Sequence, residues 1–383
     1  MEIKFLDLSQ EYAHLKSEID CIMDEILQSS SFIGGKYLQE FETNFAHFMQ
    51  ARGCVGVGNG TDALEIAIKA LNLEPNSEII LPANSFIASA EAILNNGHQA
   101  VFVDCKEDYL IDPLCIQNAL TKKTAAIMPV HLYGKACDME TIIQIAQTHH
   151  LKIIEDCSQA HGAKAIVCGE EKSIGSIGDV GCFSFYPSKN LGAYGDGGAI
   201  ISNDLGLLET CFEIANHGIK NHDKYNHHLI GRNSRLDALQ AGILNIKLKY
   251  LKASNTYRQQ LAKIYHENLS IFKNILPPSL EGFEDNSVWH LYVIRMVGSW
   301  EGKREAMIRH LKQNNIACGI HYPSDLGSLD IITTHCNCKV ISNKNAKKYA
   351  KEILSLPIGN HISQKEIQLI CQKIQEFETS CNF

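Results

Sequence analysis

The sequence predicts an α/β protein with a mainly parallel, seven-stranded sheet in a large domain and a smaller α+β domain after it. Short apolar runs alternate with helical periodicity through about residue 205, which is the pattern of a parallel sheet covered on both faces. A long polar-faced helix then leads into a second group of elements. The 383 residues, 45% of them apolar, are enough for two cores.

The elements of the large domain follow from the apolar runs and the residues that interrupt them. We expect seven strands, near residues 54–57, 79–81, 100–103, 125–130, 152–155, 181–185 and 198–202. Helices are expected between most of them, over residues 62–71, 85–95, 116–120 and 138–149. The long helix should run from about residue 236 to 268, because the apolar side chains there recur near helical spacing, as in Leu239, Ile243, Ile246 and Leu251.

The second domain follows the breaker pair Pro277 and Pro278. Its expected elements are a strand, a helix, a strand and two helices, over residues 289–296, 303–313, 317–321, 343–354 and 364–379. We place the large domain in residues 1–250 and the small one in 251–383, with the N-terminal segment free to pack on the small domain. A long polar loop over residues 216–235 is unusual in a compact domain and predicts a functional role.

Composition excludes several classes of function. The formal net charge of −8 and the scattered Lys and Arg residues argue against a nucleic-acid partner. Early charges argue against a signal peptide, and no apolar run is long enough to span a membrane, so we expect a cytoplasmic protein. The fourteen cysteines contain no C-x2-C pair and the histidines no H-E-x-x-H motif, so we predict reduced thiols and no metal site.

One lysine stands in a glycine-rich turn between two apolar runs. Residues 181–198 read Gly-Cys-Phe-Ser-Phe-Tyr-Pro-Ser-Lys-Asn-Leu-Gly-Ala-Tyr-Gly-Asp-Gly-Gly, with Lys189 near the middle. An isolated lysine is more often a solvated surface amine. The apolar and glycine-rich surroundings instead predict a desolvated amine with a lowered pKa, which is what a Schiff-base lysine requires.

Two further segments should meet this lysine at one edge of the sheet. Asp156 ends an apolar run, and the Gly58-Asn-Gly-Thr61 turn joins a strand to a helix. Alone, the acid could pair with an arginine or cap a turn, and the turn could be a helix N-cap formed by Asn59 or Thr61. Because ligands bind at the carboxyl ends of the strands, the three segments together offer an amine for an aldehyde, an anion for a pyridinium nitrogen and amides for a phosphate. Pyridoxal phosphate requires these three groups.

Eight motifs, in order along essentially the whole chain, resemble the sugar aminotransferases of the DegT/DnrJ/EryC1/StrS family. They occupy residues 58–64, 82–89, 129–134, 155–162, 183–192, 195–198, 231–235 and 319–323. The resemblance implies the aspartate aminotransferase fold, fold type I of the pyridoxal-phosphate enzymes. Cys157 and Ser158 stand where the family often has small alanine-like residues, and we assign them no chemistry. Family dehydratases have histidine in place of the lysine, so the presence of Lys189 disfavours that branch.

The resemblance also implies a role for each matching position. Lys189 would bind the aldehyde of pyridoxal phosphate and shuttle a proton between Cα of the substrate and C4′ of the cofactor. The remaining cofactor contacts would be Asp156 at the pyridinium nitrogen, Gln159 at the phenolic oxygen, Phe86 on the ring, and Gly60, Thr61 and Ser184 at the phosphate. Asn233 would reach the phosphate from the partner subunit of a homodimer, and Tyr186, His321 and Tyr322 would contact the sugar substrate. Taken alone, Phe86 could equally be a core aromatic and His321 a strand-end histidine.

The implied activity is a ping-pong transfer of an amino group from L-glutamate to a nucleotide-linked keto-sugar. The resemblance favours C3 of a dTDP-linked 3-keto-6-deoxyhexose over a C4 ketone. A UDP-linked 3-keto or 4-keto sugar, including a uronic acid, stays an alternative. Deoxyamino sugars of surface polysaccharides are the usual products of this family.

Two other classes of function agree with parts of the sequence. Gly56-x-Gly58 after a strand is typical of nicotinamide-dependent oxidoreductases, but Thr61 stands at the third glycine position and no acid lies at the expected distance, which makes this class unlikely. The other is a regulator that binds the cofactor without turnover. Intact Lys189, Asp156 and Gln159 argue against it.

Overall fold

The computed structural model describes residues 2–220, 223–280 and 286–380. Its main feature is an eight-stranded sheet in the order β1-β9-β8-β5-β4-β2-β3-β14. All seven predicted strands are present, as β1 (Gly53–Val57), β2 (Glu78–Pro82), β3 (Gln99–Val103), β4 (Thr124–Ile127), β5 (Lys152–Asp156), β8 (Val180–Ser184) and β9 (Gly198–Ser202). Neighbouring strands are parallel from β8 to β14, whereas β9 pairs antiparallel with β8 and β1.

The eighth strand, β14 (Cys338–Val340), was not predicted. It comes from the C-terminal part of the chain and extends the sheet by pairing in parallel with residues 100–102 of β3. Three residues with a lysine in the middle carry too little apolar pattern to be recognised as a strand.

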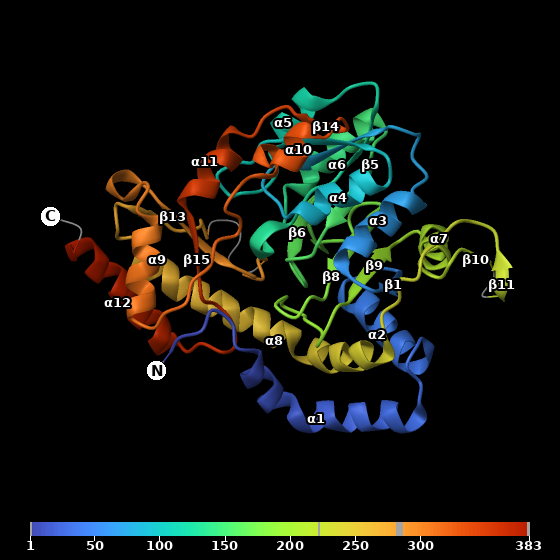
Figure 1. Cartoon of the computed structure of the whole chain (residues 1–383), viewed down its shortest axis with the longest axis horizontal. Coiled ribbons are helices and arrows are strands. Elements are labelled where there is room, and N and C mark those ends of the chain that lie inside the picture. The colour runs from blue at the N-terminus through green and yellow to red at the C-terminus, as the bar shows by residue number, and fades with distance from the viewer. Residues whose placement is uncertain (1, 221–222, 281–285, 381–383) are drawn as a thin grey trace.

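Helices cover both faces of the sheet (Figure 1). The predicted ones are α3 (Gly60–Ala70), α4 (Ile87–Asn95), α5 (Pro113–Ala119), α6 (Met139–His149) and the long α8 (Ala238–Leu269). The structure also contains three helices that are not among those predicted: α1 (Leu8–Ser29), α2 (Gly35–Phe48) and α7 (Leu205–Ala215). Helix α1 lies along α8, which extends from beneath the sheet to the C-terminal elements (Figure 1).

The C-terminal elements differ from the prediction in two places. The expected strand over residues 317–321 is absent: Gly319 makes only an isolated bridge to Ser355, and Ala317 donates to the carbonyl of Ile3. The expected helix over residues 343–354 ends earlier, as α11 (Lys344–Glu352), and is followed directly by β15 (Ile353–Leu356). All four residues of β15 are buried, and a fully buried strand has an apolar run without alternation, which resembles the end of a buried helix.

The other elements are mostly short. They are β6 (Lys164–Val167), β7 (Glu170–Ser173), β10 (Ile219–Lys220), β11 (Asp223–His227), β12 (Ile275–Leu276), β13 (Tyr292–Met296), α9 (Arg304–Gln313), α10 (Asp330–Thr334), α12 (Gln364–Ser380) and the 3-10 turns 132–134, 298–300 and 326–328. The predicted loop over residues 216–235 is therefore wrong in part, because it contains the β10-β11 pair. This hairpin extends from the body of the molecule beside α7 (Figure 1).

The two largest hydrophobic cores among the described residues hold the fold together. One surrounds the large sheet, and the other lies between α8, β13, β15, α9 and α12 and includes Ile3 from the N-terminal segment. Helix α8 contributes to both, through residues such as Leu244 and Leu261. A domain boundary at residue 250 stays a prediction, since it falls within α8. None of the described helices is both long and apolar enough to cross a membrane.

Candidate functional site

A cavity of about 920 Å³ opens beyond the carboxyl ends of β5 and β8. Ligands bind at this edge of an open α/β sheet. Ten of the eleven residues predicted for the site line it: Gly60, Thr61, Phe86, Asp156, Gln159, Ser184, Tyr186, Lys189, His321 and Tyr322. The eleventh, Asn233, is exposed and lies outside it. The cavity thus brings together segments far apart in the sequence.

Lys189 follows β8 in a turn that its own backbone closes, since its N–H donates to the carbonyl of Tyr186 at 2.8 Å. Burial lowers the pKa of the amine from 10.5 to about 8, and the negative charge of Asp156 partly opposes that change. Gly192 allows the turn, because a Cβ there would lie 2.3 Å from the carbonyl oxygen of Pro187. The pKa of Lys189 is thus shifted in the direction that the sequence predicts for a desolvated amine.

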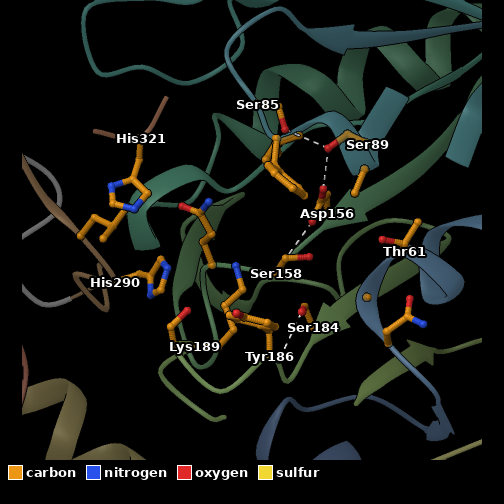
Figure 2. A pocket seen from close by; sticks show the side chains of 18 of the residues that line it. Thr61, Ser85, Ser89, Asp156, Ser158, Ser184, Tyr186, Lys189, His290 and His321 are labelled. Atoms are coloured by element: carbon orange, nitrogen blue, oxygen red, sulfur yellow. Dashed lines mark hydrogen bonds between the residues drawn. The ribbon is translucent and has the colours of Figure 1, made fainter. Parts of the chain in front are cut away.

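Asp156 is the last residue of β5 and is 5% exposed. Its Oδ2 accepts from the hydroxyl of Ser89 at 2.8 Å and its Oδ1 from the backbone N–H of Ser158 at 3.1 Å. Figure 2 shows this carboxylate and Lys189 facing the same space. Among the described residues, the two hydrogen-bond donors to this carboxylate are both uncharged. The carboxylate therefore keeps its negative charge for a cationic group of a ligand.

The N-terminus of α3 forms another wall of the cavity. Asn59 caps the helix by accepting from the N–H of Asp62 at 2.8 Å, so the N-cap interpretation is correct for this residue. Gly60 lies against Ser184, and a Cβ at position 60 would be 2.5 Å from the Cβ of Ser184. A helix N-terminus with a hydroxyl beside it, as from Thr61 and Ser184, suits a phosphate.

Aromatic and amide groups complete the wall. Gln159 accepts from the N–H of Tyr133 at 2.8 Å and donates to the hydroxyl of Tyr322 at 3.0 Å, which fixes its amide and leaves a second N–H. Phe86 is 54% exposed and lies 5.6 Å from the ring of Tyr322, so the alternative interpretation as a core residue is wrong. His321 lies outside any strand, and burial together with Lys189 lowers its pKa to about 4.

Several lining residues were not predicted. Ser89, Arg258 and His290 line the cavity, as does Phe5, whose ring stacks on His321 at 5.6 Å. Ser89 ends a recognised motif, and that was a signal for it. The other three approach the cavity only through long-range packing, which the sequence pattern does not reveal.

The segment around Asn233 is held on α3. Arg232 pairs with Asp62 at 2.6 Å and with Glu65, and the hydroxyl of Ser234 donates to Asp62 at 2.6 Å. Asn233 between them is exposed. Its neighbours are therefore fixed, while Asn233 itself is exposed and does not line the cavity of its own chain.

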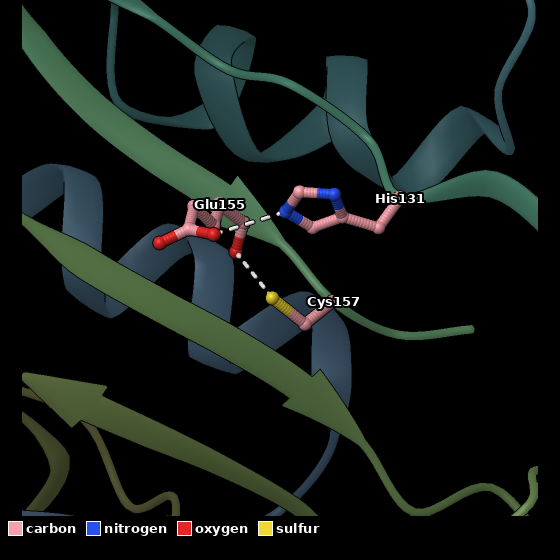
Figure 3. A group of neighbouring side chains, drawn as sticks. All are labelled: His131, Glu155 and Cys157. Carbon is pink, nitrogen blue, oxygen red and sulfur yellow. Dashed lines mark hydrogen bonds and ion pairs between the residues drawn. The ribbon is translucent and has the colours of Figure 1, made fainter. Parts of the chain in front are cut away.

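One further group of polar side chains lies close behind the site. His131, Glu155 and Cys157 are buried together (Figure 3). His131 accepts the N–H of Cys137 at its Nδ1, so its Nε2 donates to Glu155 at 3.0 Å. Glu155 also accepts backbone N–H groups of residues 175, 177 and 178, at 2.6–2.9 Å. These hydrogen bonds hold the loop over residues 175–178 against β5, so the three side chains belong to a structural network.

The described cavity fits pyridoxal phosphate. A desolvated amine, a buried carboxylate without a cationic protein partner and a helix N-terminus converge on it. The first can bind an aldehyde, the second can hold a pyridinium nitrogen, and the third can bind a phosphate dianion.

Comparisons with known proteins agree with this chemistry. The DegT/DnrJ/EryC1/StrS aminotransferase family matches residues 14–375. A dTDP-3-amino-3,6-dideoxy-alpha-D-galactopyranose transaminase of Aneurinibacillus thermoaerophilus is 41% identical, over 98% of this chain and 99% of that protein. A protein of Geobacillus stearothermophilus named "Pleiotropic regulatory protein" is 40% identical, over 98% and 99%. A UDP-N-acetyl-3-dehydro-alpha-D-glucosamine 3-aminotransferase of Acidithiobacillus ferrooxidans is 37% identical, over 97% of each chain.

Solved structures show the same fold. DesV of S. venezuelae, in complex with a ketimine intermediate, has a TM-score of 0.91 and 35% identity, covering 98% of each chain. NtdA of Bacillus subtilis, with bound cofactor PMP, has a TM-score of 0.89 and 29% identity, covering 98% of this chain and 85% of that one. The expected fold type is therefore confirmed.

Proposed function

The chain belongs to the DegT/DnrJ/EryC1/StrS aminotransferase family and is a pyridoxal-phosphate-dependent sugar-nucleotide aminotransferase, and we propose that it transfers an amino group from L-glutamate to C3 of a dTDP-linked 3-keto-6-deoxyhexose. The observation that carries the proposal is the convergence of Lys189, Asp156 and the N-terminus of α3 on one cavity. The acceptor is inferred from the dTDP-3-amino-3,6-dideoxyhexose relative, which is 41% identical over nearly the whole chain.

Pyridoxal phosphate, when bound, supplies a sink for the electron pair released at Cα of the amino donor. The residues of the chain would then divide the remaining tasks. Asp156 would hold the pyridinium nitrogen, because its two serine partners fix the carboxylate without neutralising it. Gly60, Thr61 and Ser184 would bind the phosphate, Gln159 the phenolic oxygen, and Phe86 would cover a face of the ring.

Lys189 would move the proton. With a pKa of about 8, the amine exists in both its neutral and its protonated form near physiological pH. It can therefore accept a proton from one carbon and return it to another without assistance from a stronger base. Because the amino acid and the keto-sugar react in turn at the same lysine, the kinetics would be ping-pong.

We propose a homodimer in which each subunit completes the cavity of the other. Asn233 is exposed between Arg232 and Ser234, which bind residues of α3. In the nearby hairpin region, the side chains of Tyr225 and Ile230 are 83% and 84% exposed. Large exposed apolar side chains on a projecting element are typical of a protein interface. The partner's hairpin region would thus bring an amide to the phosphate and contact the sugar nucleotide, together with Tyr186, His321 and Tyr322.

A visible absorption spectrum of the purified protein tests the proposal. A yellow band that bleaches with L-glutamate and returns with a dTDP-linked 3-keto-6-deoxy sugar would establish both half-reactions. If the band bleaches but only a UDP-linked 3-keto sugar restores it, the second candidate holds, which the relative from A. ferrooxidans supports. A band that responds to no amino donor would favour the regulator instead, the class that the name of the Geobacillus relative describes.

A further inference from the structure

His290 is a rigid part of the cavity wall to which the proposed mechanism gives no role. It lines the cavity with Lys189 and is 9% exposed. The backbone around it is fixed from two sides: the N–H of Val288 donates to the carbonyl of Gly134 at 2.9 Å, and Arg258 donates to the carbonyls of residues 289 and 290 at 3.2 and 3.4 Å. Such support is expected where a side chain must be held in one position.

The hydrogen bonds around His290 determine its tautomer. Asn190 donates from its Nδ2 to the carbonyl of Val288 at 2.8 Å, and a carbonyl can only accept. The Oδ1 of Asn190 must therefore be the atom 3.0 Å from Nδ1 of His290, and this nitrogen carries the proton. Asn255 confirms the assignment: it accepts from Asn190 at 3.0 Å while donating to the carbonyl of His161 at 2.9 Å.

The other ring nitrogen, Nε2, is consequently an acceptor. Burial and the neighbouring positive charges of Lys189 and Arg258 hold the pKa of His290 well below 6.5, and the titratable rings of His321 and His161 act in the same direction. None of the described residues forms a hydrogen bond with Nε2. Figure 2 shows His290 beside Lys189, on the side away from Asp156.

We propose that Nε2 of His290 accepts a hydrogen bond from the Lys189 amine once the amino donor has displaced that amine from the cofactor, and so directs its proton transfer; in the structure the two groups lie along the same cavity without this bond. The inference rests on the proposed function, in which Lys189 moves a proton. A neutral amine has two N–H bonds and one lone pair; with one N–H on Nε2, the lone pair is left to accept a proton. The resulting ammonium keeps the same bond and has a proton to return, while His290 itself neither gains nor loses one. His290 is thus a positioning residue for Lys189.

The tautomer can be tested without turnover. Nitrogen-15 spectra of the histidine side chains in cofactor-free protein should show one ring that keeps its proton on Nδ1 from about pH 6 to about pH 9 and that is missing from His290→Gln. A His290 ring protonated at Nε2, or one that titrates near pH 6.5, would overturn the inference.

The role is tested by rapid mixing of the cofactor-loaded enzyme with L-glutamate. His290→Phe keeps a ring but removes the acceptor, and should slow bleaching by about 10- to 100-fold, the size of effect expected from a misdirected reactive group. His290→Gln restores an acceptor oxygen and should recover the rate to within about fivefold of the natural enzyme. A His290→Phe rate within about threefold of the natural one, or a glutamine variant as slow as the phenylalanine variant, refutes the role. If the natural enzyme itself does not respond to L-glutamate, the proposed donor fails, and the nitrogen-15 result alone then decides whether the inference about His290 stands.

Discussion

A pH titration of the Lys189 amine gives the most direct test of the site. Burial lowers the pKa of this amine from 10.5 to about 8. At pH 7 about one amine in ten would then be neutral, against about one in 3,000 at the ordinary pKa, a difference of about 300-fold. Because only the neutral amine attacks an aldehyde, the rate at which cofactor-free protein captures salicylaldehyde should rise with pH and level off above about pH 8. Absorbance of the adduct measures this rate, after subtraction of the same reaction in Lys189→Ala.

The substitution Asp156→Asn should lower the pKa of Lys189 further. The carboxylate of Asp156 raises the pKa of Lys189 by favouring the ammonium form, so its removal should move the midpoint of the titration below pH 8. Salicylaldehyde has no pyridine nitrogen, so the loss of a contact to the cofactor does not complicate the comparison. A midpoint near 10 in the natural protein, or a higher midpoint in Asp156→Asn, would refute the electrostatic reasoning.

Three other predictions follow from single contacts. The Gly60→Ala substitution places a Cβ 2.5 Å from the Cβ of Ser184. It should therefore weaken the binding of pyridoxal phosphate by about tenfold or more, as measured by titration of the cofactor-free protein. An unchanged affinity would contradict the assignment of Gly60 to the phosphate. Glu155→Gln should reduce the free energy of unfolding in urea by about 2–4 kcal/mol, since the amide cannot replace the carboxylate as acceptor for all four donors; a loss below about 0.5 kcal/mol would mean that the network is not needed. The Lys189→Ala variant should keep its fold, as measured by circular dichroism, but lose all transfer of the amino group to a keto-sugar. The Asn233→Ala variant should retain this transfer at a reduced rate. A hybrid dimer of one subunit of each should have about half of the natural activity if Asn233 serves the partner's site, because one site then has both groups. A hybrid with only about half of the activity of the Asn233→Ala homodimer would assign Asn233 to its own subunit.

The part of the site that the sequence predicts best lies at strand ends. Asp156 and Ser184 each close an apolar run, and Lys189 follows within a glycine-rich turn. Parallel strands bring such positions to one edge whatever the loops between them do. The positions of Gly60 and Lys189 in the site therefore depend on the local sequence pattern and on the topology of the sheet. Both can be predicted from the periodicity of apolar residues.

The parts that were missed depend on contacts between distant segments. Strand β14 forms because residues 338–340 pair with the edge of β3. Instead of forming a strand, residues 317–321 make one isolated bridge, from Gly319 to Ser355, and a hydrogen bond from Ala317 to Ile3. His290 reaches the cavity because Asn190 and Arg258 hold it there. No local periodicity encodes these pairings, since each partner is about 30 residues or more away along the chain.

The adjacent acids Glu155 and Asp156 show how one strand serves stability and chemistry at once. Successive side chains of a strand point to opposite faces, so the first acid enters the core and the second reaches the cavity. Glu155 uses both oxygens on His131 and three backbone N–H groups, whereas Asp156 is held by two uncharged donors and keeps its charge for a ligand. Sequence alone identifies the functional acid only by its place at the end of the strand. The two substitutions above separate the roles, because Glu155→Gln should change the stability to urea and Asp156→Asn should change the pKa of Lys189. If both variants changed the same property, the division of labour along β5 would be wrong.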